Sequence, residues 1–183
     1  MAVAGGVFLN ATAGFFQVAN RARMLSPDGK CYSFDARANG FVPGEGVGVL
    51  VLKRLKDAVA AGDAIHGVIA ASGINQDGRS NGLTAPNGRA QERLERAVYD
   101  RFRIDPGTIQ VVEAHGTGSL LGDSVEHAAL TRAFREYTDR KQFCALGTVK
   151  TNIGHASAAS GVAGALKVLL SMKHGVVPPS LHF

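Results

Sequence analysis

The sequence has few of the residues on which several protein classes depend. Among 183 residues it holds 2 cysteines and no tryptophan, and 7% of its residues are aromatic. Two cysteines are too few for a disulfide framework, so the sequence predicts a reducing compartment, and we expect a cytoplasmic protein. Scarce aromatic side chains leave little surface on which nucleic-acid bases could stack.

Long hydrophobic runs are also lacking. No apolar run approaches the roughly 20 residues that cross a bilayer, and no basic leader with an apolar block opens the sequence. We therefore expect neither a membrane partner nor an export signal. With 45% hydrophobic and 19% charged residues, the chain instead has the composition of a globular domain with a buried core.

The net charge of +5 does not indicate a nucleic-acid partner. The densest basic stretch, Arg89 to Arg103, interleaves its arginines with Glu92, Glu95 and Asp100. Because phosphate binding needs unopposed positive charge, this stretch is typical of a solvated helix face, and we expect no nucleic acid to bind.

Hydrophobic patterns predict strands that alternate with helices. Short apolar segments typical of strands lie at residues 1–9, 47–52, 65–74, 109–114 and 143–149. Helical patterns lie at residues 55–61 (stopped by Gly62), from Pro86 to Phe102, from a capping box of Asp123 and Glu126 to Tyr137, and at 158–173. The last helix is apolar on nearly every side, which indicates a central position. The alternation predicts a layered α/β fold with substantial parallel pairing.

Two of the predicted strands are followed by a histidine beside a glycine. His115 follows the strand at 109–114, and His155 follows the strand at 143–149. Chemistry in α/β folds sits at such strand ends, and glycine lets a ligand approach the backbone closely. Two imidazoles in one cavity could donate hydrogen bonds to a developing oxyanion, with Lys150 nearby to tune charge or bind a carboxylate. Each histidine could instead be an ordinary core residue.

Two other kinds of site have little support. No pair among the 6 histidines has the helical spacing and third ligand of a zinc site, so we expect no metal. The turn Gly116-Thr117-Gly118, with Glu136 about 20 residues on, superficially matches a dinucleotide-binding turn. Leu121 stands where that turn needs its third small residue, which argues against this interpretation.

A series of short motifs runs through the whole chain. They are Ala4-Gly5-Gly6-Val7, Met24-Leu25-Ser26-Pro27-Asp28-Gly29, Phe34-Asp35-Ala36, Gly44-Glu45-Gly46, Asn75-Gln76-Asp77-Gly78, Thr84-Ala85-Pro86-Asn87, Glu113-Ala114-His115-Gly116-Thr117-Gly118, Gly122-Asp123 and Lys150-Thr151-Asn152-Ile153-Gly154-His155. Taken in this order, they resemble a β-ketoacyl synthase, specifically the ketosynthase domain of a modular type I polyketide synthase.

The resemblance implies a thiolase-like fold, in which two similar α/β halves stack as helix, sheet, helix, sheet, helix. The fold would be incomplete here. Residues 1–62 would be the end of the N-terminal ketoacyl-synthase half, and residues 63–183 most of the C-terminal half, truncated before its final strands. The complete domain would be a homodimer.

The resemblance also implies a reaction, the decarboxylative Claisen condensation of polyketide biosynthesis. An acyl thioester is held on an active-site cysteine, and an acyl carrier protein brings a malonyl-type thioester. The chain would bind no cofactor directly, because the phosphopantetheine arm of the carrier protein delivers the substrate.

Five residues of this chain match functional positions of the family. The two family histidines map onto His115 and His155, and the family lysine onto Lys150. The resemblance implies that His115 assists loss of carbon dioxide, that His155 holds the thioester or enolate oxygen, and that Lys150 organises the pair. Thr117 and Ser119 match positions that hydrogen-bond the pantetheine arm, although the family usually has threonine at the second of them.

The nucleophilic cysteine of the family has no counterpart in this chain. In the family it precedes the Gly-Gly strand with which this sequence begins. Cys31, in a predicted loop, and Cys144, in a predicted strand, match ordinary positions, and we interpret both as structural. We therefore expect the chain alone to be inactive in condensation. Two alternatives are a non-catalytic partner subunit that shapes an acyl-chain cavity, and an unrelated ligand-binding α/β protein.

Overall fold

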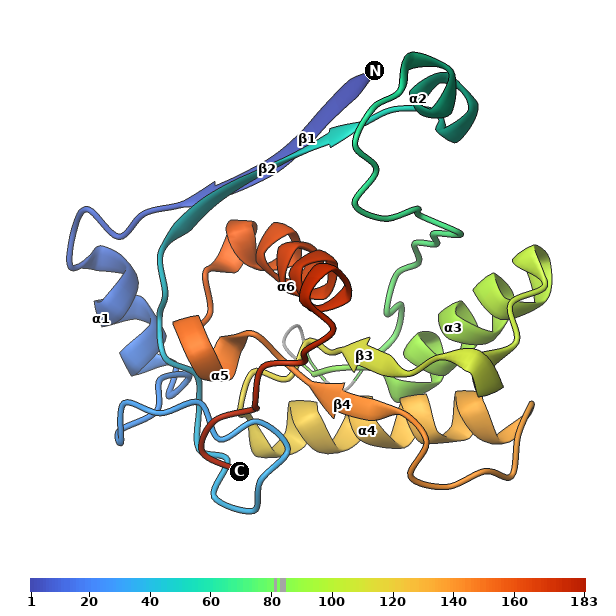
Figure 1. Ribbon diagram of the computed structural model, residues 1–183. Helices are drawn as coiled ribbons and strands as arrows, with labels where there is room; N and C mark the ends of the chain where they lie inside the picture. The colour runs from blue at the N-terminus through green and yellow to red at the C-terminus, as the bar shows by residue number, and fades with distance from the viewer. Residues whose placement is uncertain (81, 83–84) are drawn as a thin grey trace.

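A computed structural model describes residues 1–80, 82 and 85–183 (Figure 1). Thr84, which the sequence analysis placed in a motif, lies outside the described residues. The elements in chain order are β1 (Ala2–Phe8), α1 (Gly14–Arg21), β2 (Gly46–Leu52), α2 (Leu55–Ala61), α3 (Gly88–Phe102), β3 (Val111–Glu113), α4 (Leu120–Arg135), β4 (Ala145–Gly147), α5 (Lys150–Ile153) and α6 (Ser160–His174), with short 3₁₀ turns at Pro106–Thr108 and Ser157–Ala159. The predicted α/β class is confirmed.

Strands β1 and β2 form a two-stranded antiparallel sheet, in which Ala2 pairs with Leu52 and Phe8 with Gly46. Its inner face packs on α6 and on the turn before it, and glycines make this close approach possible. A Cβ on Gly48 would lie 2.9 Å from Val162 Cγ1. The outer face carries valines that are 56–75% exposed, namely Val3, Val7, Val47, Val49 and Val51.

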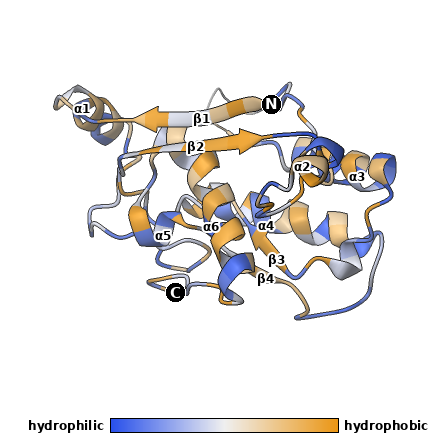
Figure 2. Ribbon diagram, turned by 45° about the horizontal axis from the view of Figure 1, so that its top comes forward, coloured by the Kyte–Doolittle hydropathy of each residue, from blue (hydrophilic) through white to orange (hydrophobic). Residues whose placement is uncertain are grey.

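Strands β3 and β4 form a second, parallel pair, in which Val111 is opposite Ala145 and Glu113 opposite Gly147. Helix α6 lies between this pair and the β1–β2 sheet, and it contacts both (Figures 1 and 2). Helices α3 and α4 pack against each other on the opposite side of β3 and β4 from α6 (Figure 1). The central position predicted for the last helix is confirmed.

The strand predicted at residues 65–74 is absent. The structure gives this segment no regular hydrogen-bonding pattern, and its apolar side chains are largely exposed, with Ile69 at 69% and Ile74 at 96%. A strand needs a neighbour with which to exchange backbone hydrogen bonds, and none of the described strands pairs with this segment. Cys144 likewise precedes β4 and is not inside it.

One helix is additional to those predicted, and two predicted helix starts need correction. Helix α1 was not predicted at all. Helix α3 begins at Gly88, because the side chain of Asn87 caps it by accepting hydrogen bonds from the backbone N–H groups of Arg89 and Ala90, at 3.1 and 3.2 Å. Pro86 therefore precedes the cap and is not in the first turn. Helix α4 begins at Leu120, before the predicted capping box of Asp123 and Glu126.

The predicted stop of the helix at residues 55–61 is confirmed. Gly62 ends α2 in the left-handed conformation, with φ of 68°.

Within the described ranges, none of the helices combines the length and apolarity that crossing a membrane requires.

Candidate active site

The two histidines selected from the sequence lie together. Parallel pairing of β3 with β4 places the carboxyl ends of both strands at one edge, and each histidine follows one of these ends. The ring centroids of His115 and His155 are 5.6 Å apart, with their planes at 88°. The structure therefore brings both imidazoles to one location.

Hydrogen bonds determine which nitrogen of His155 carries the proton. Its Nδ1 accepts from the Ser157 backbone N–H at 3.1 Å and lies 2.9 Å from Ser160 Oγ. Because Nδ1 is the acceptor, Nε2 carries the proton in the neutral ring. Burial lowers the pKa of His155 to about 4, with Lys150 and His115 adding to the effect. His155 is therefore neutral at pH 7 and presents an N–H donor.

His115 is also biased toward its neutral form. Its side chain opens toward a cavity, yet the surrounding protein atoms lower its pKa by desolvation, and the positive charge of Lys150 adds to that effect. Lys150 is buried, and its Nζ donates to the backbone carbonyl of His115 at 2.6 Å. Burial lowers the pKa of Lys150 as well. Lys150 thus anchors the backbone of one histidine and acts electrostatically on both rings.

Two carboxylates of α4 hold the loop that follows β3. Glu126 accepts from the backbone N–H of His115 at 2.6 Å and of Gly116 at 2.8 Å. Asp123 Oδ2 accepts from the backbone N–H of Gly118 at 3.2 Å and of Phe34 at 2.8 Å. The pair predicted to cap a helix instead binds the amides of the histidine loop, because α4 begins early enough to place both side chains beneath that loop.

Residues 31–44, far away in the sequence, bind both the loop around His115 (residues 114–118) and the loop around His155 (residues 154–157). We call these two segments the histidine loops. Toward the first loop, Ser33 Oγ donates to the Gly116 carbonyl at 2.6 Å, and the Gly40 N–H donates to the Gly118 carbonyl at 2.9 Å. Toward the second loop, the His155 N–H donates to the Val42 carbonyl at 2.7 Å. Sequence reasoning missed this role. The motifs at 34–36 and 44–46 were the available signal, but they do not say what the segment contacts.

The two predicted substrate-binding hydroxyls are adjacent. Thr117 Oγ1 lies 3.1 Å from Ser119 Oγ. Ser119 is the N-cap residue of α4, but its hydroxyl makes no capping hydrogen bond. The two hydroxyls therefore face each other at the start of α4, where they can bind a polar chain together.

Neither cysteine has the surroundings of a nucleophile. Cys31 is buried at 2% exposure, and its Sγ accepts from the Val42 backbone N–H at 3.4 Å. Burial raises the pKa of both the Cys31 and the Cys144 thiol. Both thiols are therefore largely protonated at pH 7, which disfavours attack on a thioester.

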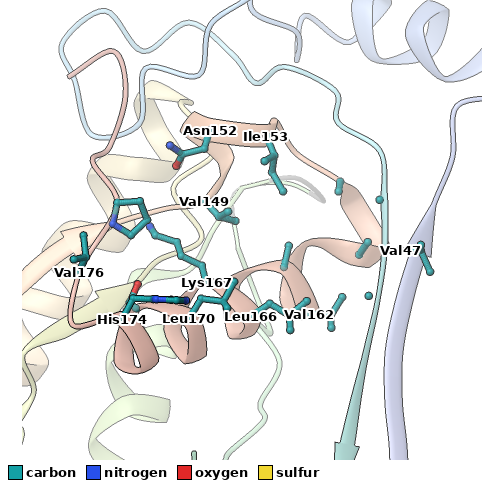
Figure 3. A pocket seen from close by; sticks show the side chains of 17 residues that line it. Val47, Val149, Asn152, Ile153, Val162, Leu166, Lys167, Leu170, His174 and Val176 are labelled. Atoms are coloured by element: carbon teal, nitrogen blue, oxygen red, sulfur yellow. The ribbon is translucent and has the colours of Figure 1, made fainter. Parts of the chain in front are cut away.

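Two cavities flank α6. The larger, of about 1410 Å³, is bordered by His115, Lys150 and Glu113, and it extends along β2 and residues 65–69. The smaller, of about 570 Å³, is mainly apolar and lies between α6, the start of β2 and α5 (Figure 3). In the part of the chain that the structure describes, no three His, Cys, Asp or Glu side chains are grouped to hold a metal ion.

Comparisons with known families match nearly the whole chain. The family model described as "Beta-ketoacyl synthase, N-terminal domain" matches residues 1–58, and that described as "Beta-ketoacyl synthase, C-terminal domain" matches residues 66–183.

Similar individual proteins are polyketide synthases and ketosynthases. The chain is 57% identical over 183 residues to the polyketide synthase PksL of Bacillus subtilis, covering 100% of this chain and 4% of that protein. The structure is similar to the ketosynthase from module 6 of the bacillaene synthase of Bacillus subtilis, with a TM-score of 0.95, 56% identity, and coverage of 100% of this chain and 34% of that one. An oxazolomycin ketosynthase domain of Streptomyces albus also has a TM-score of 0.95, at 40% identity. The match covers 99% of this chain and 31% of that one. The chain thus spans about a third of these ketosynthases.

Proposed function

The chain belongs to the β-ketoacyl synthase family, and from this premise we propose that it supplies the histidine-bearing part of a polyketide ketosynthase. The reaction would be decarboxylative Claisen condensation of an acyl thioester with a malonyl-type thioester on an acyl carrier protein. The observation that carries the proposal is the pair of imidazoles, with ring centroids 5.6 Å apart, beside a buried lysine.

The chemistry requires stabilisation of a thioester enolate. When carbon dioxide leaves the malonyl unit, the electrons of the broken C–C bond pass to the α-carbon and delocalise onto the thioester oxygen. A neutral imidazole N–H can hydrogen-bond that oxygen without protonating the carbon nucleophile. The α-carbon then attacks the acyl thioester, and the cysteine thiolate leaves. That cysteine would come from a part of the domain outside this chain.

We assign the residues by their positions. His115 borders the large cavity and would assist decarboxylation, while His155, with its proton on Nε2, would hold the thioester or enolate oxygen. Lys150 would organise the pair through the His115 carbonyl. Thr117 and Ser119 would hydrogen-bond the phosphopantetheine arm of the carrier protein, since their hydroxyls are adjacent.

The wider organisation is part of the same proposal. We place the division between the two ketoacyl-synthase halves at residues 62 and 63, in the gap between the matched ranges 1–58 and 66–183. The complete domain would be a cytoplasmic homodimer. We do not favour a non-catalytic partner subunit, because both histidines lie together and Lys150 binds the backbone of one of them.

The test uses a completed domain, which we define as the bacillaene module 6 ketosynthase with its matching third replaced by residues 1–183. His115→Ala and His155→Ala should each lower condensation by at least about 100-fold, measured as β-ketoacyl carrier protein by mass spectrometry. His127→Ala, at an exposed position of α4, is the matched control and should be neutral. Condensation within twofold of the unmodified completed domain in either test variant would reject the proposal.

A further inference from the structure

A buried ion pair lies directly behind the histidine loop. Lys167 Nζ, from the middle of α6, is 2.7 Å from Glu113 Oε2, and the two side chains are only 7% and 12% exposed. Glu113 is the last residue of β3, two residues before His115. Burying two charges costs about as much as their attraction returns, so such a pair is weak support for stability and calls for another role.

The second oxygen of Glu113 connects the pair to the backbone between β4 and α5. Glu113 Oε1 accepts from the Val149 backbone N–H at 2.5 Å, and Val149 directly precedes Lys150. One carboxylate therefore joins the end of β3, the start of α5 and the centre of α6. Figure 3 shows two of these partners, Lys167 and Val149, at the wall of the smaller cavity.

A glycine on α6 makes room for this carboxylate. A Cβ at Gly164 would lie 3.1 Å from Glu113 Cγ, which is tighter than ordinary van der Waals contact. Glu113 thus occupies the space that a side chain at this position of α6 would fill.

Glu113 also shares a cavity with the two groups that it can influence. Glu113, His115 and Lys150 all border the larger cavity. Burial lowers the pKa of Lys150, and the negative charge of Glu113 is the first effect that opposes this shift. Removing the charge of Glu113 would make the buried Lys150 amine still harder to protonate.

We propose that Glu113 and Lys167 are a positioning pair for the reaction: Lys167 holds the Glu113 carboxylate where it fixes the backbone before Lys150 and keeps a negative charge beside the Lys150 ammonium. The inference rests on the proposed function, because it assigns the pair to condensation at His115 and His155. Neither residue is proposed to touch substrate.

The experiment compares Glu113→Gln, Lys167→Met and the double variant in the completed domain. Glu113→Gln should lower kcat for condensation about 10- to 100-fold with little change in KM for the malonyl carrier protein. The basic limb of its pH–rate profile should move to lower pH, because Lys150 would lose its proton more readily. The double variant, which leaves no unpaired buried charge, should regain thermal stability but not kcat.

The exposed pair Lys53–Asp63, with the same kind of contact at 2.6 Å, provides the matched control. Asp63→Asn should leave kcat and the pH profile unchanged. If the double variant recovers both stability and kcat, the pair is only structural and the inference is wrong. The inference is also wrong if the kcat of Glu113→Gln stays within twofold of that of the unmodified domain. If the unmodified completed domain does not condense, or if His115→Ala is neutral, the proposed function itself fails and the inference with it.

Discussion

The histidine loops and the β1–β2 sheet differ in how they are supported. Around the loops, hydrogen bonds come from residues 31–44, from α4 and from Lys150. They satisfy backbone N–H and C=O groups of the turns that carry the two imidazoles. The outer face of β1 and β2, in contrast, presents its valines to solvent, and the sheet has only two strands.

This difference indicates which parts of the chain depend on further protein. Contiguous exposed apolar patches mark surfaces that other protein covers, and a lone pair of strands is marginal by itself. The histidine loops are held by contacts within the chain, whereas we expect the sheet to require the rest of a ketosynthase. Three experiments test or sharpen this contrast.

The largest expected effect is the complete loss of function in the chain alone. Purified residues 1–183 should not be acylated by an acyl-thioester donor, because burial raises the pKa of both thiols. The chain should also melt without a cooperative transition, since its apolar sheet face is uncovered. Intact-protein mass spectrometry and calorimetry measure the two outcomes. Stoichiometric acylation mapping to Cys31 or Cys144, or a cooperatively melting monomer, would contradict this expectation.

A smaller effect is expected from a charge on the outer face of the sheet. In the completed domain, Val49→Asp should lower the free energy of unfolding by about 3–5 kcal/mol, because covering protein would bury an unpaired carboxylate. Denaturant titration measures this change. Lys141→Asp, at an exposed loop position, is the control and should stay within about 0.5 kcal/mol. Equal effects of the two substitutions would show that the outer face remains in solvent.

The smallest effect concerns α3, which packs on the helix that carries Glu126. Burial raises the pKa of Glu95 to about 7, with Glu126 and Glu92 adding repulsion. The pKa of Glu95 is higher in the folded than in the unfolded state, so protonation of its carboxyl stabilises the fold. This stabilisation is complete below about pH 4 and is lost as pH rises through about 7. In the completed domain, Glu95→Gln should therefore raise Tm by roughly 2–4 °C at pH 9 and leave it unchanged at pH 4.

Glu92→Gln is the control of opposite sign. Hydrogen bonding to Arg132 lowers the pKa of Glu92, so this carboxylate stabilises the fold at high pH, and its loss should lower Tm at pH 9. If Glu95→Gln shifts Tm equally at pH 4 and pH 9, the carboxyl does not titrate as described.

Part of the fold and part of the site could be predicted from the sequence. Strands β1 and β2, the stop at Gly62 and the central helix α6 depend on short-range signals, namely apolar periodicity and the freedom of glycine. The strand expected at residues 65–74 shows the limit of those signals. Its pattern is apolar enough, but a strand forms only with a neighbour, and hydrophobicity does not identify one.

The sequence by itself determined the family, through a series of motifs that resemble it along the chain, and the fold class, through hydrophobic periodicity. It also singled out His115 and His155, whose catalytic role stays a prediction. Only the tertiary structure decided that Glu126 binds the backbone of His115, that residues 31–44 hold both histidine loops, and that Glu113 pairs with Lys167. The physical reason is that these contacts join residues far apart in the chain. A buried carboxylate takes whichever donors the packed elements bring within hydrogen-bond distance, and local sequence does not specify those donors.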